Sequence, residues 1–346
     1  MIAEESSGLR KVLFLVVLAA VLVALVLLSL GTGSVHISPS DVMHILLNQG
    51  DSRFAPNSPE FVIVREIRPP RVALAVLVGA ALALSGAVMQ GLFQNPMADP
   101  YIIGVSSGAA LGASTALSLS LNFWFLGIHS VSVFAFGGAL LIALLVYGIS
   151  IRDGRTPTTV LLLTGIAIGS LAAALTSLLL ITSSRADLHR ILFWLMGSLS
   201  SRRWEHVNMI WPYALAGTVV IQLFARDLNL LLQGEESAQY MGVRVELVKR
   251  ALLVVAALLT AAAVAVSGII GFVGLVVPHF MRMLTGPDHR SLFPASVLGG
   301  AILLVGADMA ARTLISPAEI PLGVITSLLG CPFFLFLLRR RRELPL

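Results

Sequence analysis

Charge and cysteine are both scarce in this sequence. Asp, Glu, Lys and Arg make up 12% of the 346 residues, which is about half the share found in soluble domains and excludes a soluble globular protein. The single cysteine, Cys331, excludes an intrachain disulfide and any cysteine-rich zinc or iron–sulfur site. A phosphate-binding loop of the form GxxxxGK(S/T) is also missing, so any ATP chemistry must be supplied by another chain.

Hydrophobic residues make up 57% of the chain and form long continuous runs. Continuous runs indicate transmembrane helices, whereas the strands of a membrane barrel would alternate apolar and polar residues. Because a helix needs about 20 residues to cross the hydrocarbon core, the chain has room for about ten. We therefore predict an all-α membrane protein, a single transmembrane domain over residues 1–346. The predicted spans are 12–30, 72–92, 102–119, 128–149, 159–182, 207–225, 251–270, 272–285, 293–310 and 322–338.

Basic residues at the ends of these spans predict the orientation. Arg10 and Lys11 precede the first span and the run 339–342 follows the last, so both termini are predicted to be cytoplasmic in a multi-pass protein of the inner membrane. Arg68 and Arg71 then lie outside, where basic residues are uncommon, and such a pair suggests an acidic partner there. The excess positive charge lies at segment ends and does not indicate nucleic-acid binding.

Three local patterns have simple structural readings. In the segment 86–100, Asn95 and Asp99 each precede a proline, which predicts a tight cytoplasmic connection with Asp99 capping the next helix. Asp308, the main acid within a span, is predicted to pair with Arg312 one helical turn later. His279 lies near Pro278 in a short span with irregular backbone, and no other metal ligand stands at a suitable spacing, so no metal site is predicted.

The polar stretch 226–250 is the largest predicted cytoplasmic connection. It contains a short helix that ends near Gly242. From the residues alone, a solvated loop with a surface helix is the simpler interpretation, and a segment that couples the bundle to a soluble motor is the alternative.

Several blocks, taken in order, resemble the FecCD family, the permease subunits of type II ABC importers. The blocks are Arg68–Arg71, Gly79–Pro100, Gly104–Gly108, Gly234–Val243, Gly268–His279 and Glu319–Gly323. The resemblance implies a homodimer with ten helices per subunit and a pathway along the dimer axis. It implies two cytoplasmic ATPase subunits that use ATP, an extracytoplasmic binding protein, and no cofactor bound by this chain. The cargo would be a metal chelate such as a ferric siderophore, haem or cobalamin.

The same resemblance assigns residue roles. Arg68, Arg71 and Arg312 would meet the binding protein, and Thr158 and Thr159 would form a cytoplasmic gate. The ATPase would contact a loop whose marked residues are Gly234, Glu235, Glu236, Ala238 and Gly242. Met89 and Gln90 are candidate linings of the translocation path.

Two other classes of function remain open at this point. An ion-coupled secondary transporter would take up ligand without an ATPase, and a membrane scaffold or receptor would move no ligand at all. The shortage of acids within the spans favours an importer driven from outside the chain, because ion-coupled transporters usually need buried acids or broken helices that bind ions.

Overall fold

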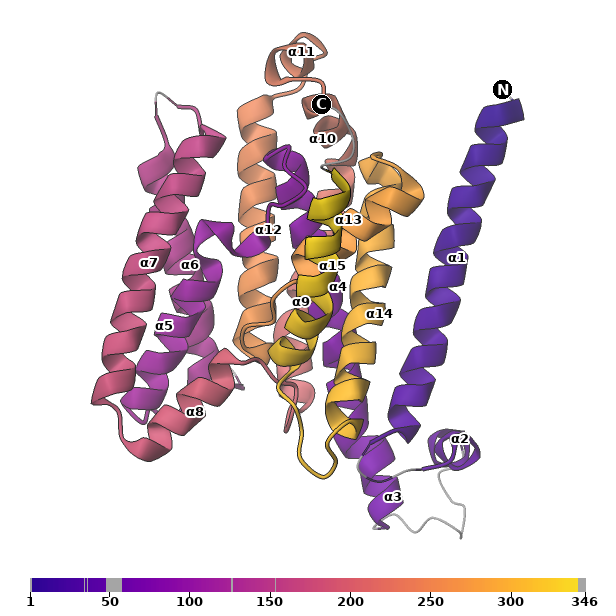
Figure 1. Cartoon of the computed structure of the whole chain (residues 1–346), viewed down its shortest axis with the longest axis vertical. Coiled ribbons are helices and arrows are strands. Elements are labelled where there is room, and N and C mark those ends of the chain that lie inside the picture. The colour runs from indigo at the N-terminus through magenta and orange to yellow at the C-terminus, as the bar shows by residue number, and fades with distance from the viewer. Residues whose placement is uncertain are drawn as a thin grey trace.

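The computed structural model describes residues 2–33, 35, 37–47, 58–125, 127–152 and 154–341. Helices account for nearly all of this part of the chain (Figure 1). They are α1 (Ile2–Gly31), α2 (Pro39–Leu47), α3 (Pro59–Val62), α4 (Arg68–Leu92), α5 (Val105–Ser118), α6 (Ser130–Ser150), α7 (Thr158–Thr182), α8 (Arg185–Leu195), α9 (Trp204–Leu223), α10 (Ala225–Leu231), α11 (Glu235–Tyr240), α12 (Val245–Ser267), α13 (Val273–Thr285), α14 (His289–Thr313) and α15 (Leu322–Arg341). A π-helical turn η1 (Ile63–Ile67), a 3-10 turn η2 (Pro100–Ile103) and a hairpin of β1 (Trp124–Phe125) and β2 (Ile128–His129) complete the elements.

The prediction of an all-α polytopic bundle is confirmed. Each predicted span coincides in order with one of the helices α1, α4, α5, α6, α7, α9, α12, α13, α14 and α15. Within the described residues, 6 helices are long and apolar enough to cross a membrane, and α9 forms with α10 a seventh candidate that is bent by 52°. Two further apolar helices are shorter than these candidates: α13 and the part Leu322–Leu335 of α15.

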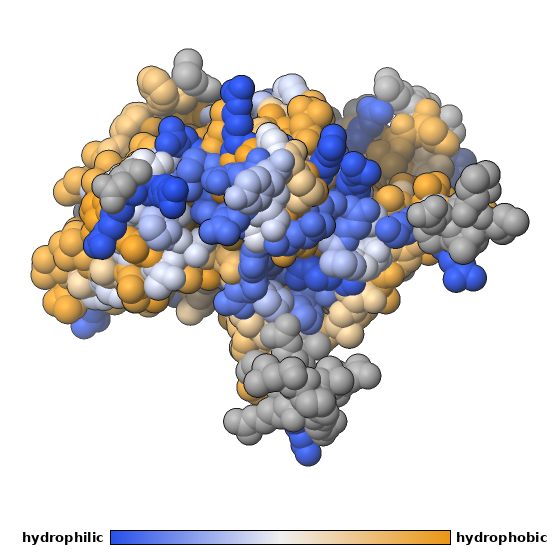
Figure 2. Space-filling model, turned by 90° about the horizontal axis from the view of Figure 1, so that it is seen from above, coloured by the Kyte–Doolittle hydropathy of each residue, from blue (hydrophilic) through white to orange (hydrophobic). Residues whose placement is uncertain are grey.

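Both ends of the bundle can be identified from the chain path. The two termini lie at the same end as α10 and α11, whereas α2, α3 and α8 lie at the opposite end (Figure 1). We call these the α11 end and the α8 end. Termini at the same end are what the predicted even number of crossings requires, and the number itself stays a prediction. Figure 2 views the α11 end and shows hydrophilic side chains gathered over the middle of this face, with hydrophobic ones around it.

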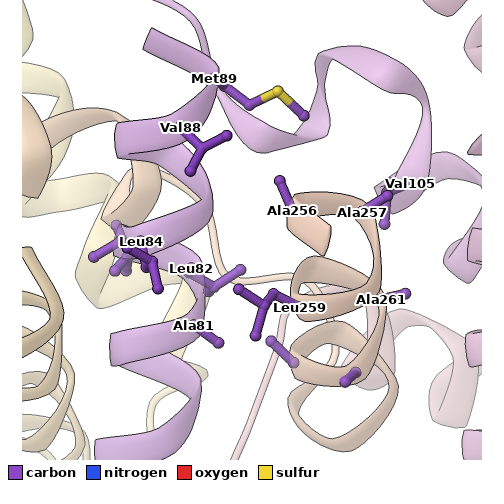
Figure 3. Packing of buried hydrophobic residues seen from close by; sticks show 14 of the residues in the cluster. Ala81, Leu82, Leu84, Val88, Met89, Val105, Ala256, Ala257, Leu259 and Ala261 are labelled. Carbon is purple, nitrogen blue, oxygen red and sulfur yellow. The ribbon is translucent and has the colours of Figure 1, made fainter. Parts of the chain in front are cut away.

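The helix α4 forms the centre of the bundle and is buried along most of its length. It packs against α9, α12, α13 and α14, and its side chains Leu82 and Met89 face the α12 residues Leu259 and Ala256 (Figure 3). Small residues permit this packing: a Cβ added at Gly79 would lie 2.2 Å from the carbonyl oxygen of Gly300 on α14. The regular spacing of glycine and alanine in α4 therefore serves close contact between backbones.

The helices α1 and α7 lie at the periphery. Only 6% of the apolar window of α1 and 17% of that of α7 is buried within the chain. Their apolar side chains point outward, as expected of surfaces that face lipid or another subunit.

The connection after α4 is more than a surface turn. As predicted, Asp99 caps the next turn: its Oδ1 accepts a hydrogen bond of 2.8 Å from the backbone N–H of Tyr101. The segment then folds back into the bundle, because the Tyr101 hydroxyl donates to the carbonyl oxygen of Ile270 at 2.8 Å and the Pro100 ring packs against Gly274. The predicted connection is thus followed directly by a segment that packs into the bundle, where Pro100 and Ile103 are buried and Tyr101 is partly buried.

Irregular backbone separates α12 from α13, as Gly271, Gly274 and Pro278 indicate. Gly268 and Phe272 both have positive φ angles, 70° and 67°, and α13 is only 13 residues long. Such backbone is tolerated in a membrane protein only where protein surrounds it, and here Ile270 and Val273 are buried.

Candidate functional sites at the two ends of the bundle

A buried ionic network joins three segments at the α8 end. Arg71 on α4 donates from Nε to Asp308 Oδ1 on α14 at 2.9 Å. Its two Nη groups donate to the two carboxylate oxygens of Glu319 at 2.8 and 3.0 Å. Arg312 Nε lies 3.0 Å from Asp308 Oδ2 in a second ion pair. Asp308 is fully buried, so this one buried carboxylate holds two cations.

The other guanidinium contacts in this region close the end of α1. Arg68 donates to the carbonyl oxygens of Leu30, at 2.7 Å, and of Val35. Arg312 donates to the Ser29 hydroxyl at 2.6 Å. The last carbonyl groups of a helix have no partner within it, and basic side chains from α4 and α14 supply donors for those of α1.

The structure thus brings Arg68, Arg71 and Arg312 together at one end, as the prediction of a shared role requires. The predicted pairing of Asp308 with Arg312 is confirmed. All three arginines are buried and bonded within the chain: Arg71 and Arg312 pair with carboxylates, whereas Arg68 bonds to carbonyl oxygens. Their role in docking a binding protein stays a prediction.

Glu319 is the residue of this network that the sequence did not single out. It lies between α14 and α15, and its side chain is 37% exposed. Burial acts to raise the pKa of Glu319, but the hydrogen bonds and charge of Arg71 outweigh it and hold the pKa below its ordinary value. An acid directly before a span, at the end that carries Arg71, was the available signal.

At the α11 end, a short helix stands on the bundle. Ala238 of α11 is fully buried, and Glu235 forms an ion pair with Lys249 on α12. Gly242 follows α11 with φ +86°, a left-handed conformation that favours glycine. The predicted short helix is confirmed, and its tip is open, since Tyr240 is 93% exposed.

The base of α11 is tied to other parts of the same end. Lys249 is buried and lies 3.6 Å from Glu246 as well. Glu246 Oε2 accepts a hydrogen bond of 3.2 Å from the backbone N–H of Thr156, before α7. Gly234 precedes α11 with φ +107°, and Glu236 is exposed in its first turn. A force applied to α11 would therefore reach both α12 and the start of α7.

The predicted gate residues lie at this same end. Thr158 and Thr159 form the first turn of α7, and Thr159 is exposed. Within the described residues neither side chain is hydrogen-bonded to α11, but the Glu246–Thr156 bond places them near its base. Their gate role stays a prediction.

The candidate path residues lie inside the subunit. Met89 is fully buried in the core. Gln90 donates to the carbonyl oxygen of Leu275 at 3.0 Å and accepts a hydrogen bond of 2.9 Å from Arg282 Nη1. Met89 thus packs between α4 and α12, whereas Gln90 lies against α13 and lines a pocket of about 290 Å³ together with Gln94 and Arg282. Their role as path residues stays a prediction. Among the described residues, no group of three or more His, Cys, Asp or Glu could hold a metal ion.

Comparison with known proteins decides the family. The sequence profile of the FecCD transport family matches residues 21–340. The chain belongs to the FecCD family. It is 50% identical over 280 residues, 81% of this chain and 74% of the relative, to the cobalamin import system permease protein BtuC of Halobacterium salinarum. It is 48% identical over 278 residues, 80% of this chain and 83% of the relative, to the hemin transport system permease protein HmuU of Yersinia pestis.

Relatives named for iron and the solved structures agree with this placement. The Fe(3+)-citrate import system permease protein YfmE of Bacillus subtilis is 37% identical over 330 residues, 95% of this chain and 96% of the relative. A metal-chelate type ABC transporter solved in an inward-facing conformation matches with a TM-score of 0.83 and 34% identity, covering 94% of this chain and 99% of that one. This FecCD member is accordingly a multi-pass permease of the ABC importer class and not the catalytic subunit.

Proposed function

We propose that this chain is half of the membrane channel of an ATP-driven importer for a metal chelate, that is, a ferric siderophore, haem or cobalamin. The cobalamin, hemin and ferric citrate names of its relatives support this cargo class. Two copies of the chain, two ATPase subunits on the α11 side and a binding protein on the α8 side would form the complete importer.

The observation that carries the proposal is the helix α11, together with the contacts that hold it on the bundle. A six-residue helix projects from the bundle, presents an almost fully exposed Tyr240, and is fastened by Glu235 to Lys249 on α12. An exposed aromatic side chain on a firmly held helix suits a contact with a partner protein. We assign this contact to the ATPase, which makes the α11 end cytoplasmic, in agreement with the basic residues at both termini.

The state of Asp308 argues against the ion-coupled alternative. A proton- or sodium-driven carrier needs a carboxylate that can gain and lose its ion during transport. Asp308 is held between Arg71 and Arg312 and is not available for this exchange. The energy for uptake would therefore come from outside the chain.

A second copy of the chain would complete the passage. A hollow of about 560 Å³ lies between α8, the turn at Ile269 and α15, and Met196, Ser327 and Cys331 are among its lining residues. The helices α7 and α15 both carry exposed apolar faces. Pairing of these faces would enclose a conduit poor in charge, with Thr158 and Thr159 at its cytoplasmic end.

Docking of the binding protein at the α8 end would exchange one carboxylate of the arginine network for another. Glu319 occupies the outward fork of Arg71 and is itself partly exposed, so a carboxylate of the binding protein could take its place with little loss of bonding. The docking prediction is refined in this way: an acidic residue of the partner would have to compete with Glu319 for Arg71.

Reconstitution with its partners tests the proposal. The chain is combined in liposomes with the ATPase and binding protein encoded beside it, and uptake of labelled ferric siderophore, haem and cobalamin is measured. We expect one cargo to accumulate only when ATP is on the side of the membrane that carries the ATPase and the binding protein is on the opposite side. Uptake that needs neither ATP nor the ATPase, but follows an ion gradient, would overturn it.

A further inference from the structure

A second polar pocket lies at the α8 end, away from the arginine network. It has a volume of about 430 Å³ and is formed by the outer end of α5, the β1–β2 hairpin, α8 and the first turn of α9. Its lining is basic and aromatic. The members that matter here are Trp124, Arg190, Trp194, Arg202, Arg203 and His206.

Arg202 lacks the partners that its charge requires. Its Nε is buried and forms no hydrogen bond, and among the described residues no carboxylate forms an ion pair with it. Burial lowers the pKa of Arg202 to about 10, so the group still carries its charge at neutral pH. A buried cation without an anion is costly, and natural sites supply a counter-ion.

Within the described part of the chain, the Arg202 side chain has one hydrogen-bond partner, His206, and that partner is shared. Arg202 Nη1 lies 3.2 Å from His206 Nε2, and the backbone N–H of Arg203 points at His206 Nδ1 at 3.3 Å. Both groups can only donate, whereas a neutral imidazole has a single nitrogen that accepts. The ring therefore satisfies at most one of the two donors, and the guanidinium fork of Arg202 remains largely free to bind an oxyanion.

The remaining charges of the pocket have the same sign. Arg203 is exposed, and Arg190 lies 3.8 Å from Asp187 with 66% of its side chain exposed, which is a weak pair. Among the described lining residues the one carboxylate is Glu205. Three arginines against one acid leave a net positive pocket that favours an anion.

The surroundings place the pocket at the level of the lipid headgroups. The hairpin carries three consecutive aromatic residues, Phe123, Trp124 and Phe125, all exposed. Trp204 is 50% exposed, and Trp211 and Leu215 continue the same exposed side of α9 toward the middle of the bundle. Exposed tryptophans at the end of an apolar helix face mark the boundary between the hydrocarbon core and water.

We propose that this pocket binds the phosphate headgroup of an anionic phospholipid from the adjoining leaflet. Arg202 would take the phosphate oxygens, Arg190 and Arg203 would add charge at the rim, and the aromatic hairpin would lie among the neighbouring lipids. The site is separate from the proposed docking and coupling contacts and does not depend on the cargo.

The test is lipid binding by the full chain. The protein is purified in detergent, and its affinity for phosphatidylglycerol and for phosphatidylcholine is measured by native mass spectrometry. We expect phosphatidylglycerol to bind more tightly. Arg202→Gln and Arg190→Gln should each weaken it roughly fivefold, the effect of losing one basic residue near an anionic headgroup. Arg185→Gln, the same charge change at an exposed position of α8 outside the pocket, should leave it unchanged.

Arg190→Gln keeps the test open if Arg202→Gln fails to fold, because Arg190 is mostly exposed. Thermal stability gives a second reading: phosphatidylglycerol should raise the melting temperature of the wild type and of Arg185→Gln more than that of the pocket variants. Equal affinity for the two lipids would overturn the proposal, as would equal losses in all three variants. Competition by free phosphate or glycerol 3-phosphate at equal strength would assign the pocket to a soluble oxyanion instead and refute the lipid.

Discussion

Replacing Asp308 by Asn probes the buried network at its centre. The change keeps the size of the side chain but removes the charge that Arg71 and Arg312 share. The pair with Arg71 includes a charge-assisted hydrogen bond of 2.9 Å, and such bonds contribute about 1.5–3 kcal/mol. Because buried Arg312 then loses its carboxylate partner and Arg71 keeps only the partly exposed Glu319, we expect a total destabilisation of about 3–5 kcal/mol.

Glu319→Gln is the matched control, since it removes the second carboxylate on Arg71. Its side chain is 37% exposed, so solvent screens the pair and the loss should be about 1 kcal/mol or less. The pKa of Glu319 lies below its ordinary value, so its contribution is complete above the unfolded pKa and is lost as pH falls through the folded one. Between pH 6 and pH 8 the difference between this variant and the wild type should therefore stay constant.

Free energies of unfolding in mixed micelles, titrated with SDS, measure both variants. The double variant Arg71→Met with Asp308→Leu should be more stable than the summed losses of Arg71→Met and Asp308→Leu predict, because it removes both partners of the Arg71–Asp308 pair together. Arg312 loses its carboxylate equally in Asp308→Leu and in the double variant, so this loss cancels from the coupling. If Asp308→Asn costs no more than Glu319→Gln, or if the double variant is additive, the network does not hold the three segments as inferred.

Further predictions concern packing and coupling. Gly86→Ala should destabilise by about 1–3 kcal/mol, because the added Cβ would lie 1.8 Å from the carbonyl oxygen of Gly274; Gly137→Ala, with open space around it, should be neutral or slightly stabilising in the same unfolding assay. Tyr240→Ala should leave the fold intact and weaken co-purification of the ATPase, and an unchanged yield of complex would count against the α11 contact. Lys249→Met, which frees the base of α11, should retain ATPase binding but lower transport per ATP hydrolysed.

Much of the fold could be predicted from the sequence because a membrane helix is recognised from a local signal, a continuous run of apolar residues. Continuous apolar runs gave ten helices in the right order, and the four-residue spacing of Asp308 and Arg312 predicted their pair. The Asp99 cap and the end of α11 at Gly242 likewise depend on residues a few positions apart.

The remaining features depend on contacts between distant parts of the chain. Arg71 and Glu319 are 248 residues apart in sequence, so charge counting near each span could not reveal that the arginine was already paired. Met89 looked like a possible path residue for the same reason: only the packing of α4 against α12 shows that it is buried. The unsatisfied Arg202 could be found only from its surroundings in space.

The central claim is that energy and cargo recognition come from partner proteins and not from this chain. Measuring whether the isolated chain can accumulate cargo tests this claim most directly. The purified permease is placed alone in liposomes, with no ATPase and no binding protein, and labelled chelate is offered under an imposed proton or sodium gradient. Asp308 is held between two arginines, and the energy for transport is proposed to come from an ATPase bound at α11. The internal concentration of the chelate should therefore never exceed the external one. Concentrative uptake under either gradient would contradict this.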